Sequence, residues 1–199
     1  MKELIRKTAL TTLAAAAGAI LLGAVVLMLF FPSVVSDGAY GMGLYRVSAT
    51  FARSAYEKDG EFSSLKTLVE RAILAEKYDL VAGYAPAFIA DDRFEDTAAE
   101  EDAGKSDERV GDYYSYVTGN LAVAQYGRGE REAALNTAAL YTVRYERYNA
   151  TEYLLKTIID RDDKAFGSEL LAEMKKYSFS GDEKALLDRD ISILESFIG

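Results

Sequence analysis

Few residues of this chain have a type and spacing that could do chemistry. Ser63 and Lys66 form an S-x-x-K sequence, the spacing at which a lysine can activate a serine nucleophile. The S-D-N and K-T-G sequences that accompany such a nucleophile are absent, and serine is a favoured residue at a helix start. We therefore interpret Ser63 as part of a helix start rather than as a nucleophile.

Residues 160–164 (DRDDK) begin like a calcium-binding loop. However, Lys164, Ala165 and Leu171 occupy the positions that require a ligand, a glycine and a bidentate glutamate. This segment is better explained as the end of one helix followed by the start of the next.

The chain contains no histidine, no cysteine and no tryptophan. Their absence excludes zinc sites of the His/Cys type, Ser-His-Asp and Cys-His nucleophiles, and histidine general bases. Carboxylate chemistry, Ser-Lys chemistry and a hard-cation site remain open, but no motif for any of them is complete. We therefore expect no enzymatic activity, no cofactor and no metal.

A net charge of −9, from 32 acidic and 23 basic residues, bears on the kind of partner. Nucleic-acid binding requires a basic face that neutralises phosphate, so we expect no nucleic-acid partner. Tight docking on anionic lipid is disfavoured for the same reason.

The elements that would position any site are helices. Apolar residues recur at three and four positions, no stretch shows sustained strand alternation, and only Pro32 and Pro86 interrupt the pattern. Turn signals at 59–60 (DG) and 127–129 (GRG) separate helical segments. The sequence predicts an all-α fold, a stack of α-hairpins, with helices over about 40–58, 62–78, 79–91, 107–126, 130–148, 151–160, 164–177 and 182–197.

Residues 91–108 depart from this pattern because they are rich in Asp and Glu and contain Phe94 as their one large hydrophobic residue. Such a segment cannot bury enough apolar surface to offset the entropy lost on ordering. We predict an exposed acidic loop at about 91–108, solvated rather than holding Ca²⁺, between two helical halves.

Residues 8–31 contain no charged side chain and are mostly apolar. A helix of this length spans about 36 Å, enough to cross a hydrocarbon core of about 30 Å. Lys2, Arg6 and Lys7 precede it, which predicts a cytoplasmic N-terminus (1–7), a single-pass transmembrane signal-anchor and an extracytoplasmic C-terminal part at the cell membrane. A cleaved signal peptide is the alternative, although its apolar region is usually only about 7–15 residues long.

Small residues recur at every fourth position of the apolar segment, at Thr11, Ala15, Ala19 and Gly23. This stripe would let another helix approach closely, which predicts self-association or docking to a membrane partner, although an alanine-rich helix also produces such stripes by chance. Residues 32–45 are rich in glycine and tyrosine and are predicted to form a flexible juxtamembrane neck. The remaining residues, 46–199, would form the extracytoplasmic helical domain.

Two segments resemble tetratricopeptide repeats (TPRs), helix-turn-helix units of about 34 residues. In residues 46–79, the sequence 56–62 (YEKDGEF) is similar to the family's turn between its two helices. Further along the chain, 119–120 (GN) resembles the middle of the first helix of a unit, and 129–130 (GE) resembles its turn. This second match needs two extra turn residues, and Ala122 stands where a tyrosine is usual.

For the family, the resemblance implies a scaffold that binds proteins or peptides and has no catalysis of its own. A generic helical bundle with glycine at its turns is the alternative. The residues that match the groove-lining positions of TPR units are Thr50, Ser54 and Glu57 in the first segment and Tyr113, Tyr116, Asn120 and Val123 in the second.

The chain contains 14 tyrosines, a residue type that suits recognition surfaces. Tyr141, Tyr145 and Tyr148 share one helix face, and we favour core packing for Tyr141 and Tyr148. Tyr113 and Tyr116 are equally compatible with packing and with binding.

The resulting hypothesis is a membrane-anchored extracytoplasmic module that binds a protein or peptide as an adaptor or assembly factor at the cell envelope. The alternatives are a carboxylate-dependent envelope hydrolase, which needs two acids in a cleft, and a purely structural membrane-tethered helical bundle.

Overall fold

The computed structural model describes the backbone at residues 2–103, 112–144 and 149–199, and every regular element in these ranges is an α-helix. The predicted all-α fold is therefore confirmed. The helices are α1 (Lys2–Phe30), α2 (Pro32–Gly41), α3 (Tyr45–Asp59), α4 (Phe62–Leu74), α5 (Tyr78–Ile89), α6 (Phe94–Ala103), α7 (Tyr113–Gly127), α8 (Arg131–Arg144), α9 (Asn149–Asp160), α10 (Lys164–Met174) and α11 (Gly181–Ile198).

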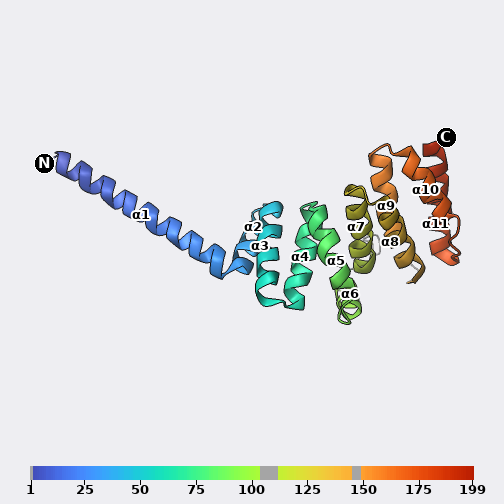
Figure 1. The fold of residues 1–199 in the computed structure, drawn as a ribbon, viewed down its shortest axis with the longest axis horizontal. Helices are drawn as coiled ribbons and strands as arrows, with labels where there is room; N and C mark the ends of the chain where they lie inside the picture. Colours follow the sequence, from blue (N-terminus) through green and yellow to red (C-terminus); the bar gives the residue numbers. More distant parts are fainter. Residues whose placement is uncertain (1, 104–111, 145–148) are drawn as a thin grey trace. The chain divides into compact units, whose positions relative to one another are not determined.

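The chain divides into two compact units, Met1–Arg71 and Ala72–Gly199, with the boundary inside α4. Within each unit, helices close together in the chain pack against one another, for example α2 with α3 and α10 with α11 (Figure 1). This arrangement is consistent with a helical repeat fold. The boundary lies within the single domain, 46–199, that the sequence analysis expects.

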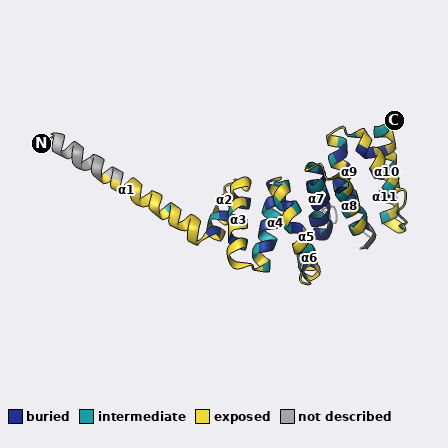
Figure 2. Ribbon diagram, viewed as in Figure 1, coloured by how far each residue is buried: buried dark blue, intermediate teal, exposed yellow. Residues whose placement is uncertain are grey.

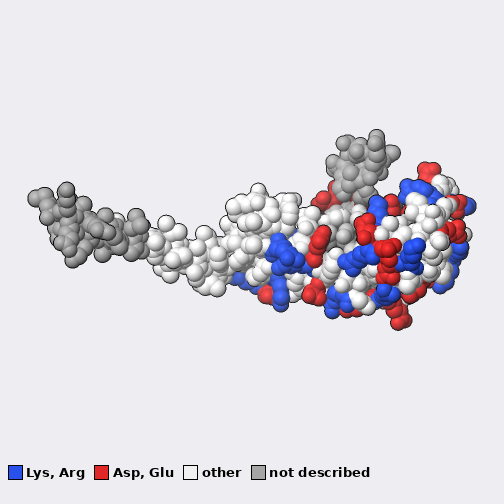
Figure 3. All heavy atoms as spheres, turned by 90° about the horizontal axis from the view of Figure 1, so that it is seen from above, with Lys and Arg blue, Asp and Glu red and all other residues white. Residues whose placement is uncertain are grey.

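Most of the described side chains of α1 are apolar and exposed. From Ala15 to Phe30 almost every residue is exposed (Figure 2), and this stretch carries no charged side chain (Figure 3). Within the described residues, no single helix has both the length and the hydropathy of a membrane span. The pair Ala15–Phe30 and Pro32–Gly41 has them jointly, with a bend of 107° between its two members.

The predicted packing stripe on α1 stays a prediction. The side chain of Thr11 lies outside those that the structure describes. Ala15, Ala19 and Gly23 are exposed in the single chain.

Residues 32–41 form α2 where the sequence analysis predicts a flexible neck. Pro32 occupies the start of the helix, where its missing N–H costs no hydrogen bond. Small side chains bury the face of α2 against α3, and the hydroxyl of Ser36 donates to the carbonyl oxygen of Ser48 at 3.0 Å. The buried Ser36 and Ala39 therefore let α2 pack closely on α3, whereas a Cβ added at Gly38 or Gly41 would meet only open space.

The same pair of backbone hydrogen bonds closes four helices in the described chain. In α4, for example, the N–H groups of Glu76 and Lys77 donate to the carbonyl oxygens of Ile73 and Ala72, both at 3.0 Å. This is the Schellman motif, in which the residue after the helix takes a positive φ. The residues at that position, with their φ angles, are Gly43 (72°), Glu76 (51°), Gly129 (82°) and Asp162 (51°).

These four helix ends fall into two pairs with the same spacing along the chain. Gly43 and Glu76 lie 33 residues apart, as do Gly129 and Asp162. The spacing is close to the period of about 34 residues of helix-turn-helix repeats. Two of these ends contain no glycine, so the recurrence is visible in the backbone but not in the sequence.

The predicted acidic loop at 91–108 is wrong for Phe94–Ala103, which form α6. Phe94 is only 1% exposed, and Ala98, one turn later, is also buried. The ring of Phe94 packs between Phe88, at a centroid distance of 5.0 Å, and Tyr114, at 5.2 Å. Burial of this ring against α5 and α7 supplies apolar stabilisation that the composition of the segment alone does not reveal. Residues 104–108 lie outside the described residues.

The α7 helix is the centre of the C-terminal unit and packs against α5, α6, α8 and α9. Ten of its residues are buried, and it is almost wholly dark in Figure 2. Its N-cap is Asp112, whose carboxylate accepts from the N–H of Ser115 at 2.7 Å. The core beyond it is formed by buried residues of α7 to α11: Ala122, Tyr126, Ala134, Ala138, Leu154, Leu155, Ile158, Phe166, Leu170, Met174, Leu187 and Leu194.

Candidate binding cleft

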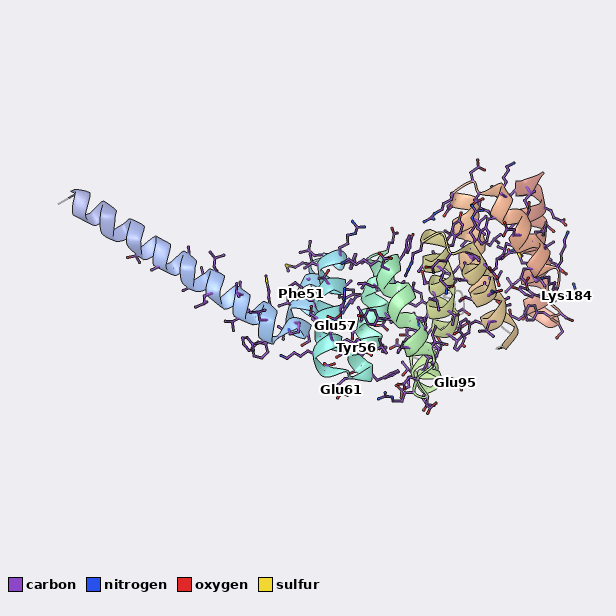
Figure 4. All side chains as sticks on the ribbon, in the orientation of Figure 1. Phe51, Tyr56, Glu57, Glu61, Glu95 and Lys184 are labelled. Carbon is purple, nitrogen blue, oxygen red and sulfur yellow. The ribbon has the colours of Figure 1, made fainter. Side chains whose placement is uncertain are left out.

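The seven predicted groove residues fall into different compact units. Thr50, Ser54 and Glu57 lie on an exposed face of α3 in the N-terminal unit (Figure 4 labels Glu57). They make contacts within their own helix: Thr50 donates to the carbonyl oxygen of Arg46 at 2.9 Å, and Glu57 pairs with Arg53 at 2.7 Å. The other four residues lie on α7 in the C-terminal unit.

Tyr113 lies in the core rather than in a groove. It is 4% exposed, its ring lies 6.4 Å from that of Phe94, and its N–H donates to Asp102 of α6 at 2.8 Å. Tyr116 is partly exposed and lies 6.2 Å from the ring of Tyr113. Tyr113 therefore joins α7 to α6, and Tyr116 packs beside it on the same helix. The side chain of Tyr141 packs edge-on against Tyr114 at 6.2 Å, as core packing predicts, and Tyr148 lies outside the described residues.

Asn120 and Val123 line a cleft of about 390 Å³ in the C-terminal unit. The cleft lies between the last turn of α4, α5, α7 and α9. Its lining combines apolar, aromatic, amide and charged side chains: Ile73, Glu76, Tyr78, Val81, Asn120, Val123, Tyr153, Lys156, Thr157, Asp160 and Arg161.

Two glycines of α7 make room for the two tyrosines of the cleft. A Cβ on Gly119 would lie 2.6 Å from Cδ2 of Tyr153, and a Cβ on Gly127 would lie 2.5 Å from Cδ2 of Tyr78. Real Cβ atoms do not approach other atoms this closely, so each ring rests against bare helix backbone. The spacing of the two glycines on α7 therefore sets where α5 and α9 place their tyrosines.

One rim of the cleft is fixed by Arg161. Its guanidinium donates to the hydroxyl of Tyr78 at 3.3 Å and lies 5.0 Å from the ring centroid of Tyr126 and 5.8 Å from that of Tyr78. These contacts join the end of α9 to the start of α5 and leave the cation on the surface.

The remaining charges of the cleft have mixed sign. Lys156 pairs with Glu152 at 3.2 Å on the same helix, and the carboxylates of Glu76 and Asp160 are exposed. Burial, and then the nearby charges of Asp112 and Glu152, raise the pKa of the Tyr153 phenol. Tyr153 is thus a neutral hydroxyl at neutral pH, able to donate or accept a hydrogen bond.

A network beneath the rim holds α7, α8 and α10 together. The hydroxyl of Tyr126 donates to Asp163 at 2.8 Å, Arg131 forms an ion pair with the same carboxylate, and Asp163 caps α10 by accepting from the N–H of Phe166. The rings of Tyr126 and Phe166 stack at 4.9 Å with an interplanar angle of 4°. The backbone hydrogen bond from Phe166, followed by the Tyr126 and Arg131 contacts, lowers the pKa of Asp163.

Residues 160–164 form the junction between α9 and α10 rather than a calcium-binding loop. Helix α9 ends at Asp160 and α10 begins at Lys164, so the interpretation as one helix end followed by a helix start is confirmed. In the described ranges, no group of three or more Asp and Glu residues is placed to hold a metal ion.

The S-x-x-K sequence lies in the first turn of α4, as a helix start requires. The Lys66 ammonium is 3.9 Å from Glu70, one turn away in the same helix. The hydroxyl of the neighbouring Ser64 donates to Asp59 at 2.8 Å.

Sequence reasoning found two of the cleft residues and missed the α9 side. One face of α9 supplies four lining residues. Lys156 and Thr157 lie three and four positions after Tyr153, and Asp160 lies four and three positions after them, which is the pattern of a single helix face. This face mixes aromatic and charged residues. Such a mixture on a predicted helix could have indicated that α9 forms one wall of the cleft.

The structure thus defines an all-helical stack with a polar and aromatic cleft lined by residues of α4, α5, α7 and α9. No family model matches the sequence, and neither curated proteins nor solved structures give a significant match to it.

Proposed function

We propose that this chain is a membrane-tethered module that binds a protein or peptide partner in the cleft of its C-terminal unit. The observation that carries the proposal is the cleft itself, in which Tyr78 and Tyr153 rest on glycine backbone and Asn120 is a further lining residue. Concave sites with aromatic walls and a few convergent polar groups are typical binding sites. Tyrosine adds contact area at low entropic cost because only two χ angles are ordered.

The helical stack is best described as TPR-like. The turns at Gly60 and Gly129 have the positive φ that the resemblance implies, and Gly119 lets the neighbouring helix α9 approach closely. The 33-residue spacing of the Schellman helix ends supports the same period. Repeat scaffolds of this kind use stacked helices to build extended concave surfaces.

Membrane tethering is supported by the exposed apolar surface of α1. Ile20, Leu21 and Leu22 are 67–72% exposed in the single chain, and an uncharged helix of this kind requires a lipid or protein environment. Lys2, Arg6 and Lys7 favour a cytoplasmic N-terminus, so the C-terminal unit would lie outside the cytoplasm. The small residues of α1 would allow self-association in the membrane.

Binding is favoured over hydrolysis by the acidic residues themselves. A carboxylate-dependent hydrolase requires an acid whose pKa is raised. Among the described carboxyl groups, those of Asp91 and Asp163 instead have a pKa lowered by hydrogen bonds from N–H donors. The net charge of −9 argues against a nucleic acid as the partner.

The proposal is tested by photocrosslinking in the native membrane. A photoreactive amino acid at the exposed rim residue Asp160 should yield a discrete protein adduct, identified by mass spectrometry. Asn120→Arg places a large cation in the cleft and should abolish that adduct. Asn136→Arg is the matched control, since Asn136 is exposed on α8 and does not line the cleft. Scattered adducts, or equal loss with both variants, would refute binding in the cleft.

A further inference from the structure

The apolar surface of the N-terminal unit continues past the end of α1. Residues 31–47, here called the α2–α3 elbow, include α2, the turn at 42–44 and the first residues of α3. In this segment seven large hydrophobic or aromatic side chains are at least 40% exposed: Phe31, Val34, Tyr40, Met42, Leu44, Tyr45 and Val47. Met42, in the turn, is the most exposed of them at 70%.

The elbow lies directly at the end of α1 because only one residue separates α1 from α2. Helix α2 follows α1 after a single residue, and the two helix axes meet at 107°. If α1 is close to the membrane normal, α2 therefore runs nearly parallel to the membrane surface. Its 10 residues extend about 15 Å, so it stays at the depth where α1 ends.

Lys58 indicates where the end of α1 would lie relative to the apolar core of a membrane. The ammonium of Lys58, near the end of α3, donates to the carbonyl oxygen of Phe30 at 2.8 Å and so satisfies one of the free carbonyls of α1. An ammonium group is stable at the headgroup level but not in hydrocarbon, so with α1 in a membrane Phe30 would lie at the boundary of the apolar core. Since the end of α3 returns to this point, the start of α2 and the end of α3 would both lie at that boundary.

Two exposed rings of the elbow make contacts within the N-terminal unit. The guanidinium of Arg71 lies 3.2 Å from the ring centroid of Tyr40 and 3.6 Å from the carboxylate of Asp37. Tyr45 lies 5.7 Å from Tyr40, so the two rings form one aromatic surface. Tyrosine prefers the membrane–water interface, where its ring meets apolar chains and its hydroxyl meets water.

We propose that the α2–α3 elbow is a second lipid contact, lying in the interfacial layer of the membrane without spanning it. The proposal rests on the proposed tethering by α1. Asp37 and Arg46 are the charged residues of the elbow, and their charges cancel. The attraction is therefore hydrophobic and needs no anionic lipid. As a consequence, the elbow limits how far α2 and α3 can tilt away from the membrane surface.

The test uses the absence of tryptophan from the chain, which makes any introduced tryptophan a unique probe. The full chain is reconstituted in phosphatidylcholine vesicles whose acyl chains carry bromine close to the headgroup or near the bilayer centre. Met42→Trp reports the elbow and Leu22→Trp reports α1. Leu140→Trp is the matched control, because Leu140 is a 54%-exposed hydrophobic residue of α8 in the other unit.

The proposal predicts that Met42→Trp emission shifts to the blue and is quenched mainly by bromine near the headgroup, whereas Leu140→Trp is quenched by neither lipid. Leu22→Trp should be quenched mainly by bromine at the bilayer centre. A Met42→Trp probe with the emission of water, beside a deeply quenched Leu22→Trp, overturns the elbow proposal and leaves the tether intact. A blue-shifted but unquenched Met42→Trp also overturns it, since protein would then cover the elbow.

The reverse result separates the two proposals. Quenching of Met42→Trp without quenching of Leu22→Trp would refute the spanning tether and keep the elbow as a surface contact. No quenching at either position would refute both.

Discussion

The ring of Tyr153 in α9 lies against the backbone of Gly119 in α7, and a Cβ on Gly119 would meet Cδ2, Cγ and Cβ of that tyrosine at 2.6–2.9 Å. The contact includes the Cβ of Tyr153, which moves only with its backbone. Gly119 therefore fixes the distance between the two helices that form the main walls of the cleft.

Gly119→Ala should destabilise the protein by about 1–3 kcal/mol, because the added methyl forces α9 away from α7. The sign is informative, since Ala in a helix interior is normally favoured over Gly by about 0.5–1 kcal/mol. Gly83→Ala in α5 is the control: a Cβ added at Gly83 would meet no atom within 4 Å, so this change should stabilise the protein. Chemical denaturation of the two variants measures both effects, and stabilisation by Gly119→Ala would contradict the packing described.

Asp163 should make stability depend on pH at the acidic end. The N–H of Phe166, the hydroxyl of Tyr126 and Arg131 hold its folded-state pKa below the ordinary aspartate value of about 3.9. The stabilisation is therefore fully present above about pH 4 and is lost as the pH falls through the lower folded-state pKa.

Asp163→Asn should cost about 1–2 kcal/mol at neutral pH, and its unfolding free energy should fall less steeply below pH 4 than that of the wild type. Denaturation curves between neutral pH and about pH 2 give this comparison. Asp160→Asn, at an exposed carboxylate on the preceding helix, serves as the control. Parallel pH profiles for wild type and Asp163→Asn would show that the network contributes nothing through ionisation.

Phe94 should hold α6 in place. Phe94→Ala removes a fully buried ring and should cost about 3–5 kcal/mol, or unfold α6 locally if that costs less. Amide hydrogen exchange followed by mass spectrometry should show faster exchange over 94–103. Phe94→Leu keeps much of the apolar volume and should give a smaller change. Unchanged protection of α6 in Phe94→Ala would mean that the helix is held by other contacts.

Glu76 takes a φ of 51° at the end of α4, a conformation in which a side chain is strained. Glu76→Gly should therefore stabilise the protein by about 1 kcal/mol. Glu76→Ala removes the same carboxylate but keeps the Cβ, so it should not stabilise. A thermal-unfolding comparison separates the two, and equal gains would trace the effect to charge rather than to backbone conformation.

The sequence predicted the helical class, most helix positions and the glycine turns because these depend on local periodicity and on φ. Gly60 and Gly129 have φ of 66° and 82°, as their turn positions require. The equivalent turns at Glu76 and Asp162 could not be predicted from composition, since neither residue is typical of a positive φ. There the Schellman hydrogen bonds outweigh the local preference.

The acidic segment shows why composition alone misjudged α6. One phenylalanine among many carboxylates suggested that nothing would be buried, but Phe94 meets Phe88 and Tyr114, which come from α5 and α7. Some carboxylates are also structural: Asp102 accepts from the N–H of Tyr113 at the start of α7. Both contacts are between helices and leave no periodic signal in the segment itself.

The candidate site was predictable only in part for a similar reason. Asn120 and Val123 followed from the repeat resemblance on α7, whereas Tyr78 and Tyr153 depend on how α5 and α9 stack against it. The glycines that receive their rings were present in the sequence at 119 and 127. Which side chains they receive is a property of the tertiary packing.

The most direct test of a bound partner is the accessibility of the cleft in the native membrane. Because the chain has no cysteine, Lys156→Cys, at an exposed position lining the cleft, gives a unique thiol. Asn136→Cys on α8 is the control. The account predicts that the Lys156→Cys thiol reacts with a polar maleimide more slowly in native membranes than in the purified protein, while Asn136→Cys reacts equally fast in both. Equal rates for both positions in both preparations would contradict an occupied cleft and the binding function proposed for it.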